Sequence, residues 1–177
     1  RDTDRSRGLG DVYKRQSEHL AKENVDYMNI AAIDVTTKFT AFYKIINEAN
    51  LAIKYIPTIK DKDPAFLQEM EDHLMGEAYF LRAYCYFMLV NLYGEPYEKE
   101  TADKALGIPF NYEHSVRERT YKRETLARSY ELIEKDLIKS IQLLEATDYT
   151  KTVFRISKGA AYLLASRFYL YKKWYCI

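Results

Sequence analysis

The chain has 177 residues, of which 47% are hydrophobic and 30% charged, with 27 Lys and Arg against 26 Asp and Glu. This composition is typical of a globular protein and excludes a disordered, collagen-like or disulfide-stapled chain. A formal net charge of +1 argues against a nucleic-acid partner, because such proteins need a basic surface. Only 6 Gly and 4 Pro leave few turn residues, so the composition favours helices over a β-sandwich or barrel.

The first sixteen residues read RDTDRSRGLGDVYKRQ and show no hydrophobic periodicity. Within them, Ser6–Gln16 resembles the translation of a transposase adapter used in sequencing libraries. The adapter DNA gatgtgtataagagacag, for example, encodes the last six of these residues, DVYKRQ. We therefore expect residues 1–16 to be non-native, and residues 17–177 to form a partial helical domain.

Two helices are predicted in the first half of the chain. The first covers about Lys38–Ile56, where apolar residues recur at intervals of three and four, and Pro57 ends it. The second runs from Asp63, an N-cap acceptor followed by proline, to Gly94, a natural C-terminal cap. From Ala78 onward both faces of the second helix are apolar, so we expect that half to be buried on all sides.

Residues 95–124 show no sustained period and are predicted to form an ordered loop excursion, a kind of segment that often carries function. The third predicted helix begins near Thr125 and buries the stripe Tyr130, Ile133, Leu137, Ile141 and Leu144. Ser157 is expected to cap the fourth, whose inward face is Ala160, Ala161, Leu164, Phe168 and Tyr171. The sequence therefore predicts an all-α fold of tetratricopeptide-like hairpins, without a strict repeat of about 34 residues.

Motifs for catalysis, cofactor binding or metal binding are not found: the sequence has no HExxH, CxxC or Walker loop. His19, His73 and His114 lie far apart without a second ligand at metal spacing, so we expect them on the surface and expect no metal or cofactor. Glu77 and Arg82 flank the most apolar stretch of the chain. A charge there needs a partner, so we predict a buried or half-buried ion pair with a neighbouring helix for each.

The chain contains 17 tyrosines, and five of them fall on or beside the predicted helical stripes and are interpreted as core: Tyr43, Tyr79, Tyr84, Tyr130 and Tyr169. Tyr97 and Tyr112 lie in the loop excursion, and Tyr27 precedes the first predicted helix. The rings of these three residues are candidates for stacking on the apolar face of a sugar. The competing interpretation, that they pack onto the helices, is favoured somewhat and stays open.

The segment Gly76–Pro96 reads GEAYFLRAYCYFMLVNLYGEP and resembles the signature GEAxFLRAxxYFxLVxxYGxxP of the SusD/RagB family. Three further blocks follow in the order of that family: Tyr43–Asn50 resembles YxxIxxAN, Arg123–Leu137 resembles RxSxxEVYxxIxxDL, and Arg155–Tyr171 resembles RxTKxAAxALLARVYL. The third block departs from its pattern at Arg128 and Ser129, where the pattern has Glu and Val. Together the blocks cover most of residues 39–174.

This resemblance implies a lipoprotein of the outer membrane of a Gram-negative bacterium, exposed on the cell surface, that captures glycans or peptides. Members of the family are not enzymes; they form a lid over a SusC-like, TonB-dependent transporter, against which their helices pack. The resemblance places the lipid anchor, the signal sequence and the C-terminal half of the family's fold outside this sequence. Ligand contacts vary with the substrate in the family, so no binding residue follows from the motifs.

Two other functions remain as alternatives. A generic helical-repeat adaptor for protein partners is compatible with the tyrosine-rich hairpins. An α-helical glycoside hydrolase would need two carboxylates held about 5–9.5 Å apart across a bound sugar, and the sequence marks no such pair. The resemblance ranks a transporter-associated binding protein first, the adaptor second and the hydrolase last.

Overall fold

The computed structural model describes residues 27–59, 68–113, 122–148 and 154–174, with side chains between residues 37 and 172. Its contacts divide the chain into two units, Arg1–Thr40 and Ala41–Ile177. Some predictions fall outside the described residues: the assignment of residues 1–16, the start of the second helix at Asp63, and the positions of His19 and His114.

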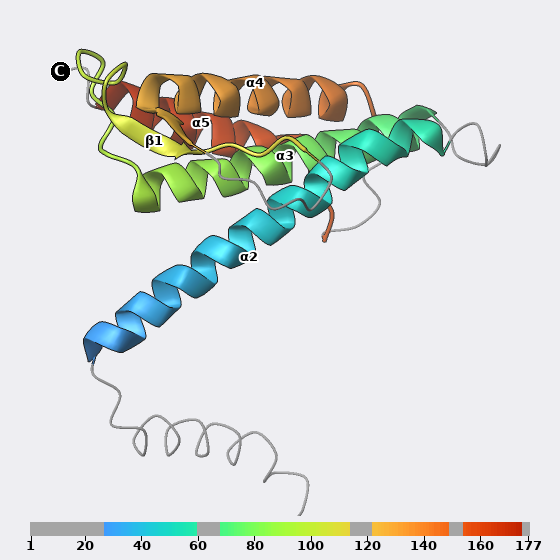
Figure 1. The fold of residues 1–177 in the computed structure, drawn as a ribbon. Helices are drawn as coiled ribbons and strands as arrows, with labels where there is room; N and C mark the ends of the chain where they lie inside the picture. The colour runs from blue at the N-terminus through green and yellow to red at the C-terminus, as the bar shows by residue number, and fades with distance from the viewer. Residues whose placement is uncertain (1–26, 60–67, 114–121, 149–153, 175–177) are drawn as a thin grey trace, which may run out of the picture. The chain divides into compact units, whose positions relative to one another are not determined.

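Four α-helices account for most of the described residues, which confirms the helical fold class (Figure 1). The elements in chain order are α2 (Tyr27–Tyr55), a 3₁₀ turn η1 (Ile56–Thr58), α3 (Gln68–Tyr93), β1 (Leu106–Pro109), β2 (Arg123–Thr125), α4 (Leu126–Glu145) and α5 (Lys158–Trp174).

The first helix begins at Tyr27 and not at Lys38, so the prediction that Tyr27 precedes it was wrong. Residues 27–37 contain no Gly or Pro that would break a helix, and the apolar stripe on which the predicted start rested begins only later. The predicted end is confirmed, because α2 stops at Tyr55 and Pro57 lies in the following 3₁₀ turn.

Within the second unit, α3, α4 and α5 pack as consecutive antiparallel helices (Figure 1). Early residues of α3 contact late residues of α4, as in the hydrogen bond from Ser140 Oγ to the Gly76 carbonyl, 2.8 Å long. The ion pair between Lys172 of α5 and Glu134 of α4, 2.7 Å, shows the same reversal for the next pair. This up-and-down order is that of the predicted helical hairpins.

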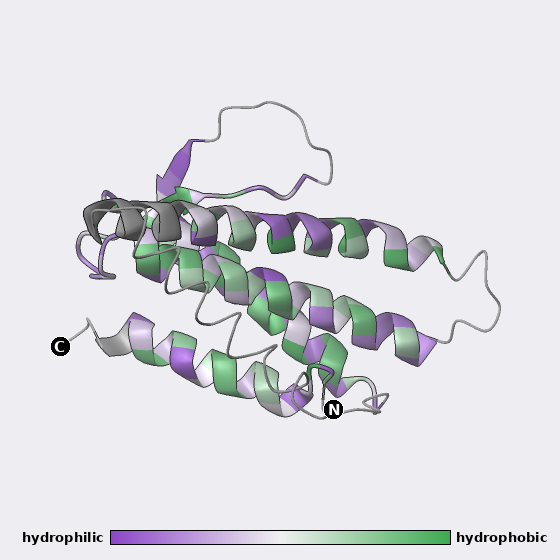
Figure 2. Cartoon of the chain, turned by 90° about the horizontal axis from the view of Figure 1, so that it is seen from below, coloured by the Kyte–Doolittle hydropathy of each residue, from purple (hydrophilic) through white to green (hydrophobic). Residues whose placement is uncertain are grey.

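Each helix of this unit mixes hydrophobic and hydrophilic residues, as Figure 2 shows. On α4 the predicted stripe is confirmed: Tyr130, Ile133, Leu137 and Leu144 are buried and Ile141 partly so. On α5 the residues Ala161, Leu164 and Phe168 are buried as predicted, whereas Tyr171 is exposed. The predicted cap is also present, since the Ala160 amide donates to Ser157 Oγ over 3.3 Å.

The C-terminal half of α3 is not buried on all sides, so that prediction was wrong. Ala83, Tyr86 and Val90 are buried, but Leu81 and Tyr84 are exposed. Apolar residues occur both in the core and on the surface, so residue type alone does not decide burial. The described neighbours of α3 do not cover the side of the helix that carries Leu81 and Tyr84.

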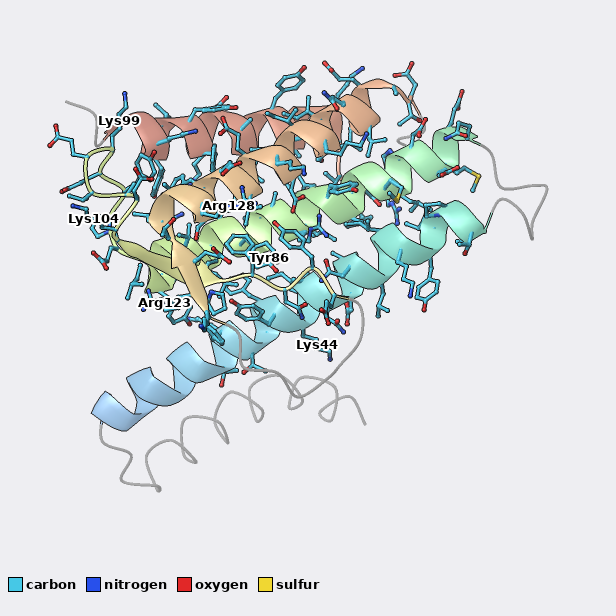
Figure 3. All side chains as sticks on the ribbon, turned by 45° about the horizontal axis from the view of Figure 1, so that its top comes forward. Lys44, Tyr86, Lys99, Lys104, Arg123 and Arg128 are labelled. Atoms are coloured by element: carbon cyan, nitrogen blue, oxygen red, sulfur yellow. The ribbon has the colours of Figure 1, made fainter. Side chains whose placement is uncertain are left out.

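The predicted loop excursion contains a short antiparallel sheet that the sequence analysis missed, in which β1 pairs with β2. Arg123 holds it to the end of α3: its side chain donates to the carbonyls of Gly107, at 2.7 Å, and Tyr93, at 2.9 Å (Figure 3). Ser129, one of the two departures from the family pattern, adds a polar contact, because its Oγ donates to the Thr125 carbonyl over 2.9 Å. The sheet fixes both ends of the residues that follow β1.

Candidate functional site

Tyr112 is the most exposed of the predicted ligand-side tyrosines whose side chains are described, with 41% of its surface accessible. It follows β1 and lies at the edge of a pocket of about 920 Å³. We call this pocket the Tyr112 groove. It is lined by Tyr79 and Arg82 of α3, by Tyr112, and by one side of α4 from Arg128 to Gln142.

The floor of the Tyr112 groove is an ion pair between α3 and α4. Arg82 Nε donates to Asp136 Oδ2 and Arg82 Nη2 to Asp136 Oδ1, each over 2.7 Å, and both side chains are buried. A third donor nitrogen, Nη1, reaches Asn50 Oδ1 on α2 at 2.8 Å. The predicted buried ion pair of Arg82 is therefore confirmed, with Asp136 as its partner.

The guanidinium of this ion pair also contacts two aromatic rings that line the groove. The Arg82 guanidinium carbon lies 4.6 Å from the ring centroid of Tyr112 and 5.2 Å from that of Tyr79. Both distances fit cation–π contacts, which are stronger when the cation is desolvated. Burial raises the pKa of the Asp136 carboxyl, while the hydrogen bonds and charge of Arg82 oppose that rise. The ionised form of Asp136 thus depends on Arg82.

Side chains of α2 and α3 hold the segment 109–113, which carries Tyr112, by hydrogen bonds to its main chain. The Tyr43 hydroxyl donates to the Pro109 carbonyl over 2.6 Å. The Tyr86 hydroxyl donates to the Asn111 carbonyl, at 2.7 Å, and accepts from the Asn111 amide, at 2.8 Å (Figure 3). The Asn50 amide nitrogen also donates to the Asn111 carbonyl, at 2.8 Å. Burial raises the pKa of both phenols, so they remain neutral donors at neutral pH.

Tyr97 occupies a different environment from Tyr112. Its ring centroid lies 4.5 Å from that of Tyr130, a buried residue of α4, and it does not line the Tyr112 groove. Tyr27 is the first residue of α2, and its side chain lies outside the described residues. The structure therefore does not bring the three predicted tyrosines together in the described part of the chain.

A second, partly buried polar cluster joins the first half of α3 to the segment before α5. Glu77 accepts a hydrogen bond from the Ile156 amide over 2.9 Å and forms an ion pair with Arg155. The ion pair predicted for Glu77 is therefore present, but its partner lies in the segment before α5 and not in a helix as predicted. His73 lies one turn earlier, with Nε2 3.3 Å from Glu77 Oε1. His73 is only 1% exposed, so its predicted surface position was wrong. Its spacing of four residues from Glu77 placed both on the buried face of α3.

The four sequence blocks meet in these two clusters. Tyr43 and Asn50 come from the first block, Arg82 and Glu77 from the second, Asp136 from the third, and Arg155 from the fourth. The sequence analysis did not assign Asn50, Tyr86 or Asp136 to the site. The signal that could have found them was their position in the quoted blocks together with the need of Arg82 for a buried acceptor.

Neither a metal cluster nor a membrane-spanning helix is found in the described part of the chain. No three His, Cys, Asp or Glu side chains among these residues are grouped so as to hold a metal ion. No helix in the described ranges is long and apolar enough to cross a membrane.

Residues 2–170 match a family model described as SusD-like, starch-binding associating with the outer membrane. No curated protein matches the chain. Solved structures that resemble it include a putative sugar-binding protein from Bacteroides vulgatus, 32% identical, with a TM-score of 0.66. That match covers 80% of this chain and 30% of the other.

A SusD superfamily protein from Bacteroides thetaiotaomicron is 26% identical over 77% of this chain and 28% of its own length, with a TM-score of 0.62. A laminarin-binding SusD-like protein is 23% identical over 77% of this chain and 26% of its own, with a TM-score of 0.59, which shows a shared fold. The chain therefore spans less than a third of the length of these solved structures.

Proposed function

The chain belongs to the SusD-like family, described as starch-binding and associating with the outer membrane, and from this membership we propose its function. On this basis the protein is a surface glycan-binding component of a TonB-dependent nutrient-uptake system and works with a SusC-like transporter. The observation that carries this proposal is the family match over residues 2–170. A binding role needs no proton transfer, and the family is one of binding proteins and not of enzymes.

The ligand side of the described residues is, in this proposal, the Tyr112 groove. Stacking on a sugar needs a ring that is exposed yet fixed, and Tyr112 combines an exposed ring with a backbone held by Tyr43, Asn50 and Tyr86. Fixing the backbone beforehand lowers the entropy lost when a ligand binds. Tyr97 packs on Tyr130 of α4 and is assigned to the helical frame.

Calorimetric titration of the full chain with starch, laminarin and galacturonan oligosaccharides tests the binding role. We expect Tyr112→Ala to lower the affinity for the oligosaccharide that binds by about 3- to 10-fold, which is the range of one aromatic contact. Tyr112→Phe should retain most of the affinity because it keeps the ring. Tyr84→Ala is the matched control, since Tyr84 is exposed to a similar degree but does not line the groove.

Binding to none of these oligosaccharides would contradict the glycan-binding role. Equal losses in the Tyr112→Ala and Tyr84→Ala variants would remove Tyr112 from the ligand side and leave the role itself standing. Circular dichroism of each variant separates loss of binding from loss of the fold.

Outer-membrane association follows from the family. The lipid anchor, the exposure on the cell surface and the SusC-like partner are part of the proposal. Pull-down of the protein from detergent-solubilised outer membranes of its host tests them, with a TonB-dependent barrel protein as the expected partner. Recovery of the protein in the soluble fraction with other partners would instead support the helical-repeat adaptor.

A further inference from the structure

The charges that line the Tyr112 groove do not cancel. Its cations are Arg82, Arg128, Lys135 and Lys139, and its anions are Glu131, Glu134 and Asp136. All three carboxylates have a cationic partner. Asp136 is bound by Arg82, Glu131 by Arg128 at 2.7 Å, and Glu134 by Lys172 of α5, also at 2.7 Å.

Two lysines of the groove take part in none of these ion pairs. Lys135 and Lys139 line the groove, are exposed, and form no ion pair with any residue that the structure describes. They are four residues apart on α4, so their side chains leave the same face of the helix about 6 Å apart along its axis. Lys135 also acts electrostatically on the Asp136 carboxyl, which Arg82 already binds. The groove thus presents two neighbouring ammonium groups that stand outside the ion pairs of the described residues.

These lysines share the groove with an exposed aromatic ring. A neutral sugar chain would use the ring of Tyr112 and leave both ammonium groups to water. A sugar chain with carboxylate or sulfate groups would use the ring and both charges, because its anionic substituents would lie within reach of the lysines while the ring covers the C–H face of a sugar unit.

From this arrangement we propose that the Tyr112 groove selects acidic glycans, with Tyr112 as the stacking ring and Lys135 and Lys139 as the two charge contacts. The inference rests on the proposed glycan-binding function and narrows its substrate class. Exposed charge contacts are individually weak and are screened by salt. The selectivity therefore comes from the pair acting together, and it declines with ionic strength.

The test uses two ligands that share one sugar backbone and differ at its carboxyl groups: charged oligogalacturonate and its neutral methyl ester, titrated into the full chain at low and high salt. We expect the acid to bind about 2- to 30-fold more tightly than the ester at low salt, the range of two exposed charge contacts, and this preference to shrink at high salt. The double variant Lys135→Gln/Lys139→Gln should lose the preference and keep its affinity for the ester.

Lys99→Gln/Lys104→Gln is the control, since both lysines are exposed on the turn before β1 and neither lines the groove (Figure 3). Equal affinity for acid and ester, or a preference that the control pair removes as well as the groove pair, overturns the inference while the glycan-binding role survives. Binding of neither ligand overturns the inference; the role itself then falls only if starch and laminarin oligosaccharides also fail to bind.

Discussion

Gly76 of α3 and Leu144 of α4 approach so closely that a Cβ atom on Gly76 would lie 2.8 Å from Leu144 Cγ. Leu144 is buried, and the Gly76 carbonyl accepts the hydrogen bond of Ser140 one turn away on α4. The absence of a side chain at position 76 therefore sets the distance between the two helices that form the floor of the Tyr112 groove.

Gly76→Ala is expected to destabilise the protein by about 1–3 kcal/mol, because a methyl group in a filled core forces its neighbours to shift. Gly159→Ala is the control. A Cβ at Gly159 of α5 would meet only Ser157 Oγ at 3.6 Å, an ordinary contact, so helix propensity should make this change neutral or stabilising by up to about 1 kcal/mol. Urea unfolding of both variants measures the difference, and similar midpoints would contradict the close approach.

Asp136→Ala is expected to cost about 3–5 kcal/mol, since it leaves the buried Arg82 guanidinium without its carboxylate. Glu131→Ala removes a carboxylate from the same helix, but its ion pair with Arg128 is exposed, so we expect a change of at most about 1 kcal/mol. The free energy of unfolding of the two variants decides the point. A small effect of Asp136→Ala would show that solvent reaches Arg82.

Tyr86→Phe removes a hydroxyl that both donates to and accepts from the main chain of Asn111. The loss should destabilise the protein by about 1–3 kcal/mol, because the Asn111 amide is left without its acceptor. Amide hydrogen exchange should speed up at Asn111 in this variant. Tyr84→Phe, which alters an exposed ring on the same helix, should leave that exchange rate unchanged.

Stability should fall as the pH rises above about 9. Burial raises the pKa of the Cys85 thiol from 9.0 to about 12 and raises the pKa of the Tyr86 phenol above its ordinary value of 10.0. The unfolded chain therefore loses these protons first, and their stabilising contribution, complete below pH 9, is lost through the alkaline range. Each such group lowers the free energy of unfolding by about 1.4 kcal/mol per pH unit there. Urea titrations at successive pH values measure the slope, and a flat profile would contradict the burial of both groups.

The sequence predicted those parts of the structure that repeat over several turns. The stripe on α4 and the long apolar run of α3 determined where both helices lie, and Pro57 determined where α2 ends. The need of a buried charge for a partner correctly marked Glu77 and Arg82. Tyr112 could be predicted as a candidate because it is an aromatic residue in an irregular segment. The groove could not be predicted, because the residues of α4 that line it depend on how α3 packs against α4.

What the sequence did not show depended on contacts between distant segments. β1 and β2 have four and three residues, too few for an alternating pattern, and β2 depends on Arg123 reaching Gly107 and Tyr93. His73 looked like a surface residue by its type, yet it is buried beside Glu77 in the packed structure. Which carboxylate accepts from Arg82 likewise followed only from the antiparallel order of α3 and α4.

The side chains that hold residues 109–113 form their hydrogen bonds with backbone atoms of this segment: the carbonyls of Pro109, Asn111 and Glu113 and the amide of Asn111. Every amino acid has that carbonyl, and all but proline have that amide. The side chain at position 112 can therefore be exchanged without removing any of these hydrogen bonds. Such an attachment lets one helical frame acquire new ligand preferences by single substitutions at position 112, which cost the ring contact with Arg82 but none of these hydrogen bonds.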